Sequence, residues 1–595
     1  MRLPRPSATI LTTPPWPILL PTPATGYNSS TVRRRPSTVV RRPLIHKEPT
    51  MKVADVVAKI LKAEGVDYFF AYPVNHLIEA AAKADIRTII VRQERVGLHM
   101  AEAIGRLTSG RKIGVFGMQH GPGAENAFGG VAQAYGESAP LVVLPMGYPR
   151  EQSYVNPNFS SARSFAPVTK LSEQLLTPGM IVASLRRAFT AVRNGRPRPA
   201  LVEIPTDLMM AELPDDWTYT PAPTVRYGPD PADVEKAADM LLAAQKLVIY
   251  AGQGVHYAAA WAELQEFAEL LEAPVTTTLS GKSAFPENHP LYLGAGNRSM
   301  PRPLWDALQS ADTIFGIGNS FTITSFGFKV PAGKRIMQAT LDPADINKDV
   351  PVDHALLGDA KLTLQALNGA IRTRLGGQSR GRRAALVDQI ATGKAAWLAE
   401  WMPKLTSNET PLSPYRVIWD LMQTVDVPNT IITHDAGSPR DQLAPFWEAT
   451  EPLSYIGWGK TTQLGYGLGL AMGAKLLHPD KLCINVWGDA AIGFTGMDFE
   501  TAVRERIPIL SILFNNFSMA IEIPIMQVST EKYGATNISG HYADMAKAFG
   551  GYGERVTTPE QIIPAIQRGI AQTQAGVPAL LEFITAKETT ISMFS

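Results

Sequence analysis

The sequence has one cysteine, almost no net charge and no hydrophobic run long enough to cross a membrane. The single cysteine, Cys483, excludes an internal disulfide and is typical of a reducing compartment, so we expect a packed thiol in a cytoplasmic protein. A formal charge of +2 gives no electrostatic reason to expect nucleic acid or a membrane as a partner. The remaining composition, 45% hydrophobic and 18% charged residues, is typical of a soluble globular protein.

The first fifty residues differ in composition from the rest of the chain. They are rich in Arg, Pro, Ser and Thr and contain one acid, Glu48. Their apolar patch, residues 16–20, is too short for a membrane span or a signal-peptide core. An organellar transit peptide has this composition. A disordered leader, or a start codon assigned too early, is favoured because an amphipathic helix pattern begins at Met51 and continues to Glu64.

Beyond residue 50, strand-length apolar runs alternate with helix-length amphipathic segments, a pattern typical of doubly wound sheets. A chain of 595 residues is too long for one core. We therefore predict an α/β fold with three doubly wound parallel-sheet domains. The expected divisions are a leader (1–50), an N-terminal domain (51–220), a central Rossmann-like domain (228–375), a connector with a solvated basic face (376–412) and a C-terminal domain (413–595).

The most informative stretch lies in the last of these domains. An apolar run of strand length ends in a Gly-Asp pair (482–489), an amphipathic segment follows and stops at Pro508, and a second apolar run ends in Asn-Asn (509–516). Strand, helix and strand in this order predict a right-handed βαβ crossover. Asp489 and Asn516 then lie just beyond the carboxyl ends of two parallel strands, where open α/β sheets bind ligands.

The residues at these two strand ends suit a metal-bound diphosphate. The Asp489 carboxylate, the Asn516 side-chain oxygen and a nearby backbone carbonyl form a hard oxygen set of the kind that Mg2+ prefers. The small residues Ala490 and Ala491 open a helix N-terminus whose free N–H groups suit a phosphate. An ordinary βαβ unit with a turn Asp and a turn Asn explains the same residues, so this pattern alone leaves both interpretations open.

The spacing resembles the thiamine-diphosphate signature of the acetolactate synthase and pyruvate decarboxylase superfamily. Asn516 stands 27 positions after Asp489. In that family the Asp, the second Asn and a carbonyl two residues on hold Mg2+, which implies that Asp489, Asn516 and Ser518 are the metal ligands here. The family usually has Gly where this chain has Ala490, a position that needs only its backbone. The resemblance assigns to the diphosphate end of the cofactor Gly437, Ser438, Gly488, Asp489, Ala490, Ala491, Asn516 and Ser518.

A second part of the resemblance lies in the first domain. Glu94 stands past a predicted strand and ahead of a helix, where a lone Glu is most simply a solvated acid. However, Glu94, His99-Met100-Ala101-Glu102 and Gly121-Pro122-Gly123-Ala124-x-Asn126 together resemble the family's pyrimidine-binding domain. The resemblance implies that Glu94 bonds N1′ of the aminopyrimidine and drives the 4′-imino form, which takes the proton from thiazolium C2. It also implies that Gly121, Pro122, Gly123 and Asn126 bind the cofactor.

A third part is the segment from Gly459 to Gly469, a glycine-punctuated entry to an apolar helix. By itself this is only a faint phosphate signal. In the family the segment supports the pyrimidine, which implies that Leu464 wedges the cofactor into a V and that the Thr462 carbonyl bonds the 4′-nitrogen. Without the resemblance, Leu464 is an ordinary core leucine.

The central region resembles the family's middle domain, which carries FAD in acetolactate synthases. Its Gly252-Gln253-Gly254 follows a predicted strand and is a weak nucleotide signal alone. Residues 294–298 and 319–321 differ from the flavin-contacting stretches of those enzymes, which counts against FAD.

The three blocks occur in family order. The resemblance implies a thiamine-diphosphate- and Mg2+-dependent, acetolactate synthase-like enzyme that decarboxylates a 2-oxo acid and transfers the acyl carbanion to a carbonyl acceptor. The stretch after Asn516 lacks the tryptophan with which acetolactate synthases select the acceptor, so the substrate stays open. The alternatives are a 2-oxo-acid decarboxylase, a thiamine-dependent C–C lyase of the 2-hydroxyacyl-CoA type, and a cofactor-binding scaffold without turnover. In this family the glutamate and the diphosphate site come from opposite subunits, which implies a homodimer or homotetramer with interfacial active sites.

Two histidines are candidate catalytic residues. His76 follows a turn that family geometry places over the thiazolium, and His120 immediately precedes Gly121. A neutral imidazole at either place can donate to a carboxylate or carbonyl as charge develops. Each is also explained as a hydrogen-bonded loop histidine.

Overall fold

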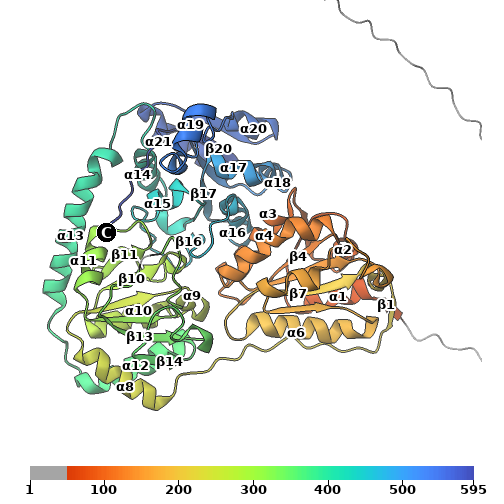
Figure 1. The fold of residues 1–595 in the computed structure, drawn as a ribbon, viewed down its shortest axis with the longest axis horizontal. Coiled ribbons are helices and arrows are strands. Elements are labelled where there is room, and N and C mark those ends of the chain that lie inside the picture. The colour runs from red at the N-terminus through yellow and green to blue at the C-terminus, as the bar shows by residue number, and fades with distance from the viewer. Residues whose placement is uncertain (1–49, 328, 595) are drawn as a thin grey trace, which may run out of the picture. The chain divides into compact units, whose positions relative to one another are not determined.

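The computed structural model describes residues 50–327 and 329–594. They contain three six-stranded parallel sheets, each flanked by helices (Figure 1). The predicted α/β class with three doubly wound domains is therefore confirmed. The leader predicted for residues 1–50 lies outside the described residues, apart from Thr50. Within the described ranges, no helix combines the length and the apolar character that a membrane crossing needs.

The N-terminal domain is built on a parallel sheet of strand order β3-β2-β4-β5-β7-β6. Its strands are β2 (Tyr68–Ala71), β3 (Arg87–Ile90), β4 (Gly114–Met118), β5 (Leu141–Gly147), β6 (Leu171–Gln174) and β7 (Ala200–Pro205). Its helices are α1 (Val53–Ala63), α2 (His76–Lys83), α3 (Glu94–Leu107), α4 (Pro122–Gly136), α5 (Ser161–Ser164), α6 (Ile181–Arg193) and α7 (Thr206–Met209). An antiparallel pair, β1 (Thr50–Lys52) and β8 (Glu212–Pro214), lies beside them.

The central domain has the strand order β11-β10-β9-β12-β13-β14, again parallel throughout. Its strands are β9 (Leu247–Ala251), β10 (Val275–Thr278), β11 (Tyr292–Gly296), β12 (Thr313–Ile317), β13 (Arg335–Thr340) and β14 (His354–Leu357). Its helices are α8 (Pro231–Ala243), α9 (Gly254–Ala258), α10 (Trp261–Leu271), α11 (Arg302–Ser310) and α12 (Ala360–Leu375). The long helix α13 (Arg383–Leu405) connects it to the third domain.

The C-terminal domain has the strand order β16-β15-β17-β18-β20-β19 and is also parallel. Its strands are β15 (Thr430–His434), β16 (Tyr455–Ile456), β17 (Leu482–Gly488), β18 (Leu510–Asn515), β19 (Tyr552–Val556) and β20 (Ala579–Ile584). Its helices are α14 (Pro414–Thr424), α15 (Ser438–Leu443), α16 (Tyr466–Leu477), α17 (Asp489–Thr495), α18 (Phe499–Arg504), α19 (Gln527–Tyr533), α20 (Tyr542–Ala548) and α21 (Pro559–Gln574).

Two predicted helices are wrong in detail. Met51 and Lys52 lie in strand β1, because their backbone pairs with β8, and the first helix begins only at Val53. The single helix predicted before Pro508 is divided into α17 and α18. The division lies where the buried Asp498 carboxylate accepts the Arg92 N–H at 2.7 Å and the Thr501 hydroxyl at 2.8 Å. These bonds hold Asp498 directly before the start of α18.

The predicted solvated basic face of the connector is wrong for Arg380 and Arg382, whereas Arg383 is exposed. The Arg380 guanidinium donates to the carbonyls of Leu242 and Ala244, both at 3.0 Å, and Arg382 donates to the Gln245 carbonyl at 3.2 Å. Helix α8 ends at Ala243, so these carbonyls are at or just beyond its C-terminus, where no intrahelical N–H is available. The arginines therefore satisfy a helix end in the central domain.

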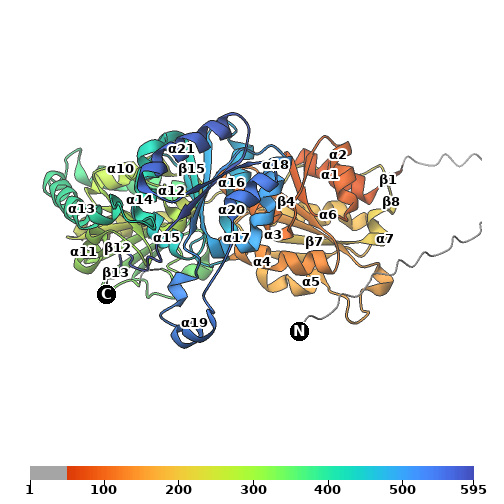
Figure 2. The ribbon, with the colours of Figure 1, turned by 90° about the horizontal axis from the view of Figure 1, so that it is seen from above.

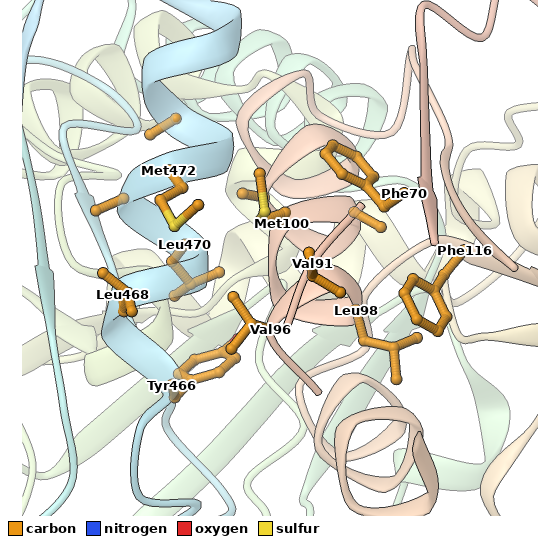
Figure 3. Packing of buried hydrophobic residues seen from close by; sticks show 14 of the residues in the cluster. Phe70, Val91, Val96, Leu98, Met100, Phe116, Tyr466, Leu468, Leu470 and Met472 are labelled. Carbon is orange, nitrogen blue, oxygen red and sulfur yellow. The ribbon is translucent and has the colours of Figure 1, made fainter. Parts of the chain in front are cut away.

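The N- and C-terminal domains pack together through α3 and α16, which lie side by side (Figures 1 and 2). Figure 3 shows Val96 and Met100 of α3 against Leu468, Leu470 and Met472 of α16. Every residue of α3 except Arg95 is buried, because its other face packs on the N-terminal sheet. Close approach depends on glycine: a Cβ at Gly473 would lie 2.6 Å from the Met100 carbonyl oxygen.

Candidate active site

The carboxyl ends of β17 and β18 bring the predicted metal ligands together. The two strands are parallel neighbours, with Gly488 paired to Phe514, so the residues that follow them meet at one edge of the sheet. The backbone N–H of Ser518 lies 3.1 Å from the Asp489 carboxylate and 2.9 Å from the Asn516 side-chain oxygen. Three residues separated along the chain thus share one small site.

The chemistry of this donor set fits Mg2+. Burial raises the pKa of Asp489, and hydrogen bonds from backbone N–H groups of Ser518 and Ala490 act in the opposite direction. Within the described residues, no donor reaches the Ser518 carbonyl, and the buried Ser518 hydroxyl has no hydrogen-bond partner. The described residues contain no group of three or more His, Cys, Asp or Glu side chains placed to hold a metal ion. The site instead offers one carboxylate, one amide oxygen and one free carbonyl.

The first turn of α17, which follows Asp489, carries only small side chains. Ala490 and Ala491 add only methyl groups there, and a Cβ built on the exposed Gly493 would meet no atom within 4 Å. Gly437, with φ of +84°, turns the chain into α15, and Pro439 lies 3.7 Å from a Cβ built on Gly488. The loop that carries Gly437 and Ser438 is therefore a neighbour of the Gly488-Asp489 turn, as the resemblance requires.

The segment that carries Thr462 and Leu464 is fixed against the same sheet edge. The buried Asp435 carboxylate accepts the N–H groups of Gly465 and Gly467, both at 2.9 Å, and the Thr495 hydroxyl donates to the Gly465 carbonyl at 2.9 Å. Burial raises the pKa of Asp435 to about 6. Leu464 is half-buried and packs at the margin of the core, so it is not an ordinary fully buried core leucine.

A second group of predicted residues lies in the N-terminal domain. Glu94 is the first residue of α3 and is 3% exposed; the Asn126 side chain hydrogen-bonds its carboxylate, and a Cβ built on Gly123 would lie 3.4 Å from Glu94 Oε1. Burial raises the pKa of Glu94, whereas its backbone bond and Asn126 lower it. A carboxyl group with a raised pKa is suited to sharing a proton with a ring nitrogen.

The two candidate histidines occupy the same edge of the N-terminal sheet. Asn75 caps α2 at the Leu77 N–H (2.8 Å) and donates to the Met118 carbonyl at 3.1 Å, which holds the turn before His76 beside the end of β4. The His120 ring packs edge-on against Tyr148, with centroids 4.5 Å apart. Burial lowers the His120 pKa, and its buried Nδ1 has no partner among the described residues.

The predicted site residues fall into two groups, one in each terminal domain, which we call half-sites. The residues predicted for the N-terminal half-site are Glu94, His76, His120, Gly121, Pro122, Gly123 and Asn126. The residues predicted for the C-terminal half-site are Gly437, Ser438, Thr462, Leu464, Gly488, Asp489, Ala490, Ala491, Asn516 and Ser518. In the part of the chain that the structure describes, no hydrogen bond or ion pair joins Glu94 to residues 489–518.

Sequence reasoning missed Tyr148 and Asp435. Both stand directly after parallel strands, β5 and β15, so the strand-end rule that selects Asp489 could have found them. It also missed Glu137, at the end of α4, for which the sequence offers no signal.

A cavity of about 230 Å³ lies at the carboxyl ends of the central-domain strands, and residues of the N-terminal domain line it as well. The glycines of Gly252-Gln253-Gly254 are explained without a ligand, since a Cβ on Gly252 would lie 2.3 Å from the Gly318 carbonyl oxygen. Lys460 of the C-terminal domain also lines this cavity, and burial lowers its pKa to about 7. None of these contacts is particular to a flavin, and the absence of FAD stays a prediction.

Three domain families match the chain. Residues 51–164 match the N-terminal thiamine pyrophosphate-binding domain of thiamine pyrophosphate enzymes, residues 234–367 match the central domain, and residues 435–583 match the C-terminal thiamine pyrophosphate-binding domain. Each match falls on one of the three sheets.

Relatives extend over nearly the whole chain. It is 29% identical over 567 residues to a probable acetolactate synthase large subunit of Methanocaldococcus jannaschii, covering 90% of this chain and 92% of the relative. It is 28% identical over 569 residues to the glyoxylate carboligase of Escherichia coli O157:H7 (92% and 95% covered) and 26% identical over 541 residues to the acetolactate synthase large subunit of Haemophilus influenzae (87% and 92%). The chain therefore belongs to the thiamine-diphosphate-dependent enzyme superfamily, in its acetolactate synthase-like group.

Proposed function

We propose that the protein is a Mg2+-dependent carboligase that decarboxylates a 2-oxo acid and transfers the acyl group to a carbonyl acceptor. The observation that carries the proposal is the convergence of Asp489, Asn516 and Ser518 at one sheet edge, with the Ser518 carbonyl unused by the described residues. The relatives support this reaction class, since those named above are acetolactate synthases and a glyoxylate carboligase.

The residues of this chain have distinct tasks in the proposal. When bound, thiamine diphosphate supplies a nucleophilic carbon and an electron sink for decarboxylation. Asp489, Asn516 and the Ser518 carbonyl would hold Mg2+ and through it the diphosphate, and the half-buried Leu464 would pack against the cofactor. Glu94 holds a proton at the pyrimidine N1′, for which its burial suits it.

The proposed active unit is a homodimer in which Glu94 of one protomer faces the partner's Asp489. Two observations support it. Among the described residues of one protomer, no hydrogen bond or ion pair joins Glu94 to residues 489–518. The segment after Asn516 also exposes a series of apolar side chains, which is typical of a surface that a partner covers. Figure 2 shows α19, at the end of this segment, projecting from the C-terminal domain. The exposed side chains are Phe517, Ile521, Ile525, Val528 and Tyr533. We also retain the cytoplasm as the location, supported by the buried, unpaired Cys483.

A second candidate reaction is cleavage of a 2-hydroxyacyl-CoA. The cavity at the carboxyl ends of the central-domain strands favours it, because a CoA diphosphate requires basic side chains and three line the cavity: Arg111 and Arg196 of the N-terminal domain and Arg226 of the linker. Arg196 is paired with Asp345 at 2.6 Å, so part of this charge is already neutralised. The carboligase remains the first choice.

Incubation with a panel of substrates tests the proposal. Purified protein with Mg2+ and thiamine diphosphate should consume at least one 2-oxo acid and release CO2 together with a condensed hydroxyketo acid, measured by mass spectrometry. Omission of either Mg2+ or thiamine diphosphate should abolish both products. CO2 with free aldehyde alone would favour a simple decarboxylase, cleavage of a 2-hydroxyacyl-CoA would favour the lyase, and no consumption of any compound would favour a scaffold.

Replacing His120 by Phe should lower kcat for the 2-oxo acid about 10²-fold. Phe keeps the edge-on packing on Tyr148 but removes the ring nitrogen that can donate to the substrate. The affinity for thiamine diphosphate should not change, as fluorescence titration can establish. The control is His541→Phe, since His541 is exposed, stands directly before α20 and belongs to neither half-site. An unchanged kcat in His120→Phe would remove His120 from the catalytic residues.

A further inference from the structure

Residues 457–463 of the C-terminal domain, here called the strip, are held by hydrogen bonds to side chains of the N-terminal domain. Glu137, fully buried at the C-terminus of α4, accepts three successive backbone N–H groups with its carboxylate. The distances are 2.9 Å to Gly459, 2.7 Å to Lys460 and 3.3 Å to Thr461. Residues 459–461 have no regular secondary structure, so this one carboxylate replaces the backbone partners that a helix or strand would give them.

Three more side chains of the same domain hold the rest of the strip. The Thr461 hydroxyl donates to the Gln133 amide oxygen. The buried Arg106 donates to the Gly457 carbonyl at 2.7 Å. The His99 ring lies 2.8 Å from the Gln463 amide oxygen through Nε2. Burial lowers the His99 pKa to about 3, so the ring is neutral and its Nε2–H is the donor in this bond.

The strip leads directly into the residues that the proposed function places against the pyrimidine. Thr462 lies between two positions held by the N-terminal domain, Thr461 and Gln463, and its own side chain is exposed. Beyond Leu464, the Asp435 carboxylate holds Gly465 and Gly467 from the C-terminal side. The backbone direction at Thr462 is therefore fixed from both domains.

We propose that Glu137 is a positioning residue, which sets the Thr462 carbonyl and Leu464 for the cofactor's pyrimidine ring through its three backbone bonds. The inference rests on the proposed function, because only that function gives Thr462 and Leu464 a ligand. A buried carboxylate without partners is costly, and three charge-assisted bonds across a domain boundary remove that cost. The N-terminal domain thus has two roles in the proposal. It carries Glu94 at the start of α3, and side chains of α3 and α4 hold the strip in place.

The variants Glu137→Gln and Glu137→Ala test this role. Gln keeps an oxygen on one side only and places an NH2 against N–H groups on the other, so it loses at least one of the three bonds; Ala loses all of them. We expect the Kd for thiamine diphosphate to rise about 10-fold in the Gln variant and about 100-fold in the Ala variant. At saturating cofactor, kcat should fall, whereas KM for the 2-oxo acid should stay unchanged. Amide exchange at residues 459–461, measured on the cofactor-free protein, should accelerate.

A matched control and a second variant make the result decisive. Glu203 is also buried and accepts the Ala162 N–H at 2.6 Å, but wholly inside the N-terminal domain, so Glu203→Gln should change stability without changing cofactor affinity. If the Glu137 variants do not fold, Thr461→Val removes the bond to Gln133 with little change of shape and should raise Kd about 3-fold. Faster exchange at 459–461 with unchanged Kd would overturn the positioning role. Wild-type protein that binds no thiamine diphosphate would instead overturn the proposed function.

Discussion

Replacing Glu94 by Gln should lower turnover about 10²- to 10⁴-fold while the protein still folds and binds thiamine diphosphate. The two side chains have the same shape, so the contacts with Asn126 and Gly123 can persist. The amide, however, cannot give up or take up a proton at N1′ as a carboxyl group can. Removal of the C2 proton of the cofactor, which depends on that proton, should therefore slow. The loss should therefore fall on kcat, with the Kd of the cofactor nearly constant.

Exchange of the C2 proton of bound thiamine diphosphate for deuterium, followed by NMR after acid quench, measures this step apart from the substrate. Glu125→Gln is the matched control, since Glu125 is exposed on α4 in the same domain. Turnover and C2 exchange should keep wild-type values in the control and fall together in Glu94→Gln. Equal exchange rates in the two variants would remove Glu94 from the mechanism.

The Glu94 substitution should not destabilise the cofactor-free protein at neutral pH. Burial raises the pKa of Glu94 in the folded state, so folding favours its protonated form. Stability from such a carboxyl is present at acid pH and is lost as pH rises from the unfolded pKa through the folded pKa. Gln stays neutral at every pH, so its thermal midpoint should equal or exceed that of the wild type above this window.

Local patterns were sufficient to predict the sheets and the polar residues at their edges. Strand β17 and strand β18 are apolar runs that end in Gly-Asp and Asn-Asn, and a parallel sheet brings such ends together without further information. Glu94 also begins a helix soon after a strand, β3, but its position alone indicated a solvated acid, and only the resemblance to the family made it a site residue. What these residues share is that one strand or helix determines their place.

Contacts between distant segments could not be predicted in this way. The segment that begins at Met51 has the periodicity of a helix, but Met51 itself pairs with β8, about 160 residues later, and so lies in a strand. The sequence around Arg380 predicts a solvated charge, but its guanidinium donates to the carbonyls of Leu242 and Ala244, more than 130 positions earlier. In the sequence, Glu137 is only a polar residue at the end of a helix. Its buried carboxylate is explained by the backbone N–H groups of residues 459–461, which hydrogen-bond it. Each depends on packing between elements that sequence spacing does not relate.

Replacing Asp489 by Asn should abolish most of the stabilisation that Mg2+ and thiamine diphosphate give the protein. Asn keeps the shape and one oxygen but loses the only carboxylate of the donor set, so we expect affinity to fall at least 100-fold. At a cofactor concentration 100 times the wild-type Kd, the ligand adds about 2.7 kcal/mol to wild-type stability and about 0.4 kcal/mol to a variant that binds 100-fold more weakly. Chelation of Mg2+ from the wild type should give the same loss.

The cofactor-free protein separates this effect from structural damage. Burial raises the pKa of Asp489, so an ionised carboxylate there costs folding free energy, and Asn should leave the thermal midpoint without ligands unchanged or higher. Asp498→Asn is the control, because Asp498 is a buried carboxylate of the same domain that bonds Arg92 and Thr501. It should change the midpoint equally with and without cofactor. If the cofactor raised the thermal midpoint of Asp489→Asn as much as that of the wild type, the metal would be held elsewhere, because no other carboxylate belongs to the donor set at this sheet edge.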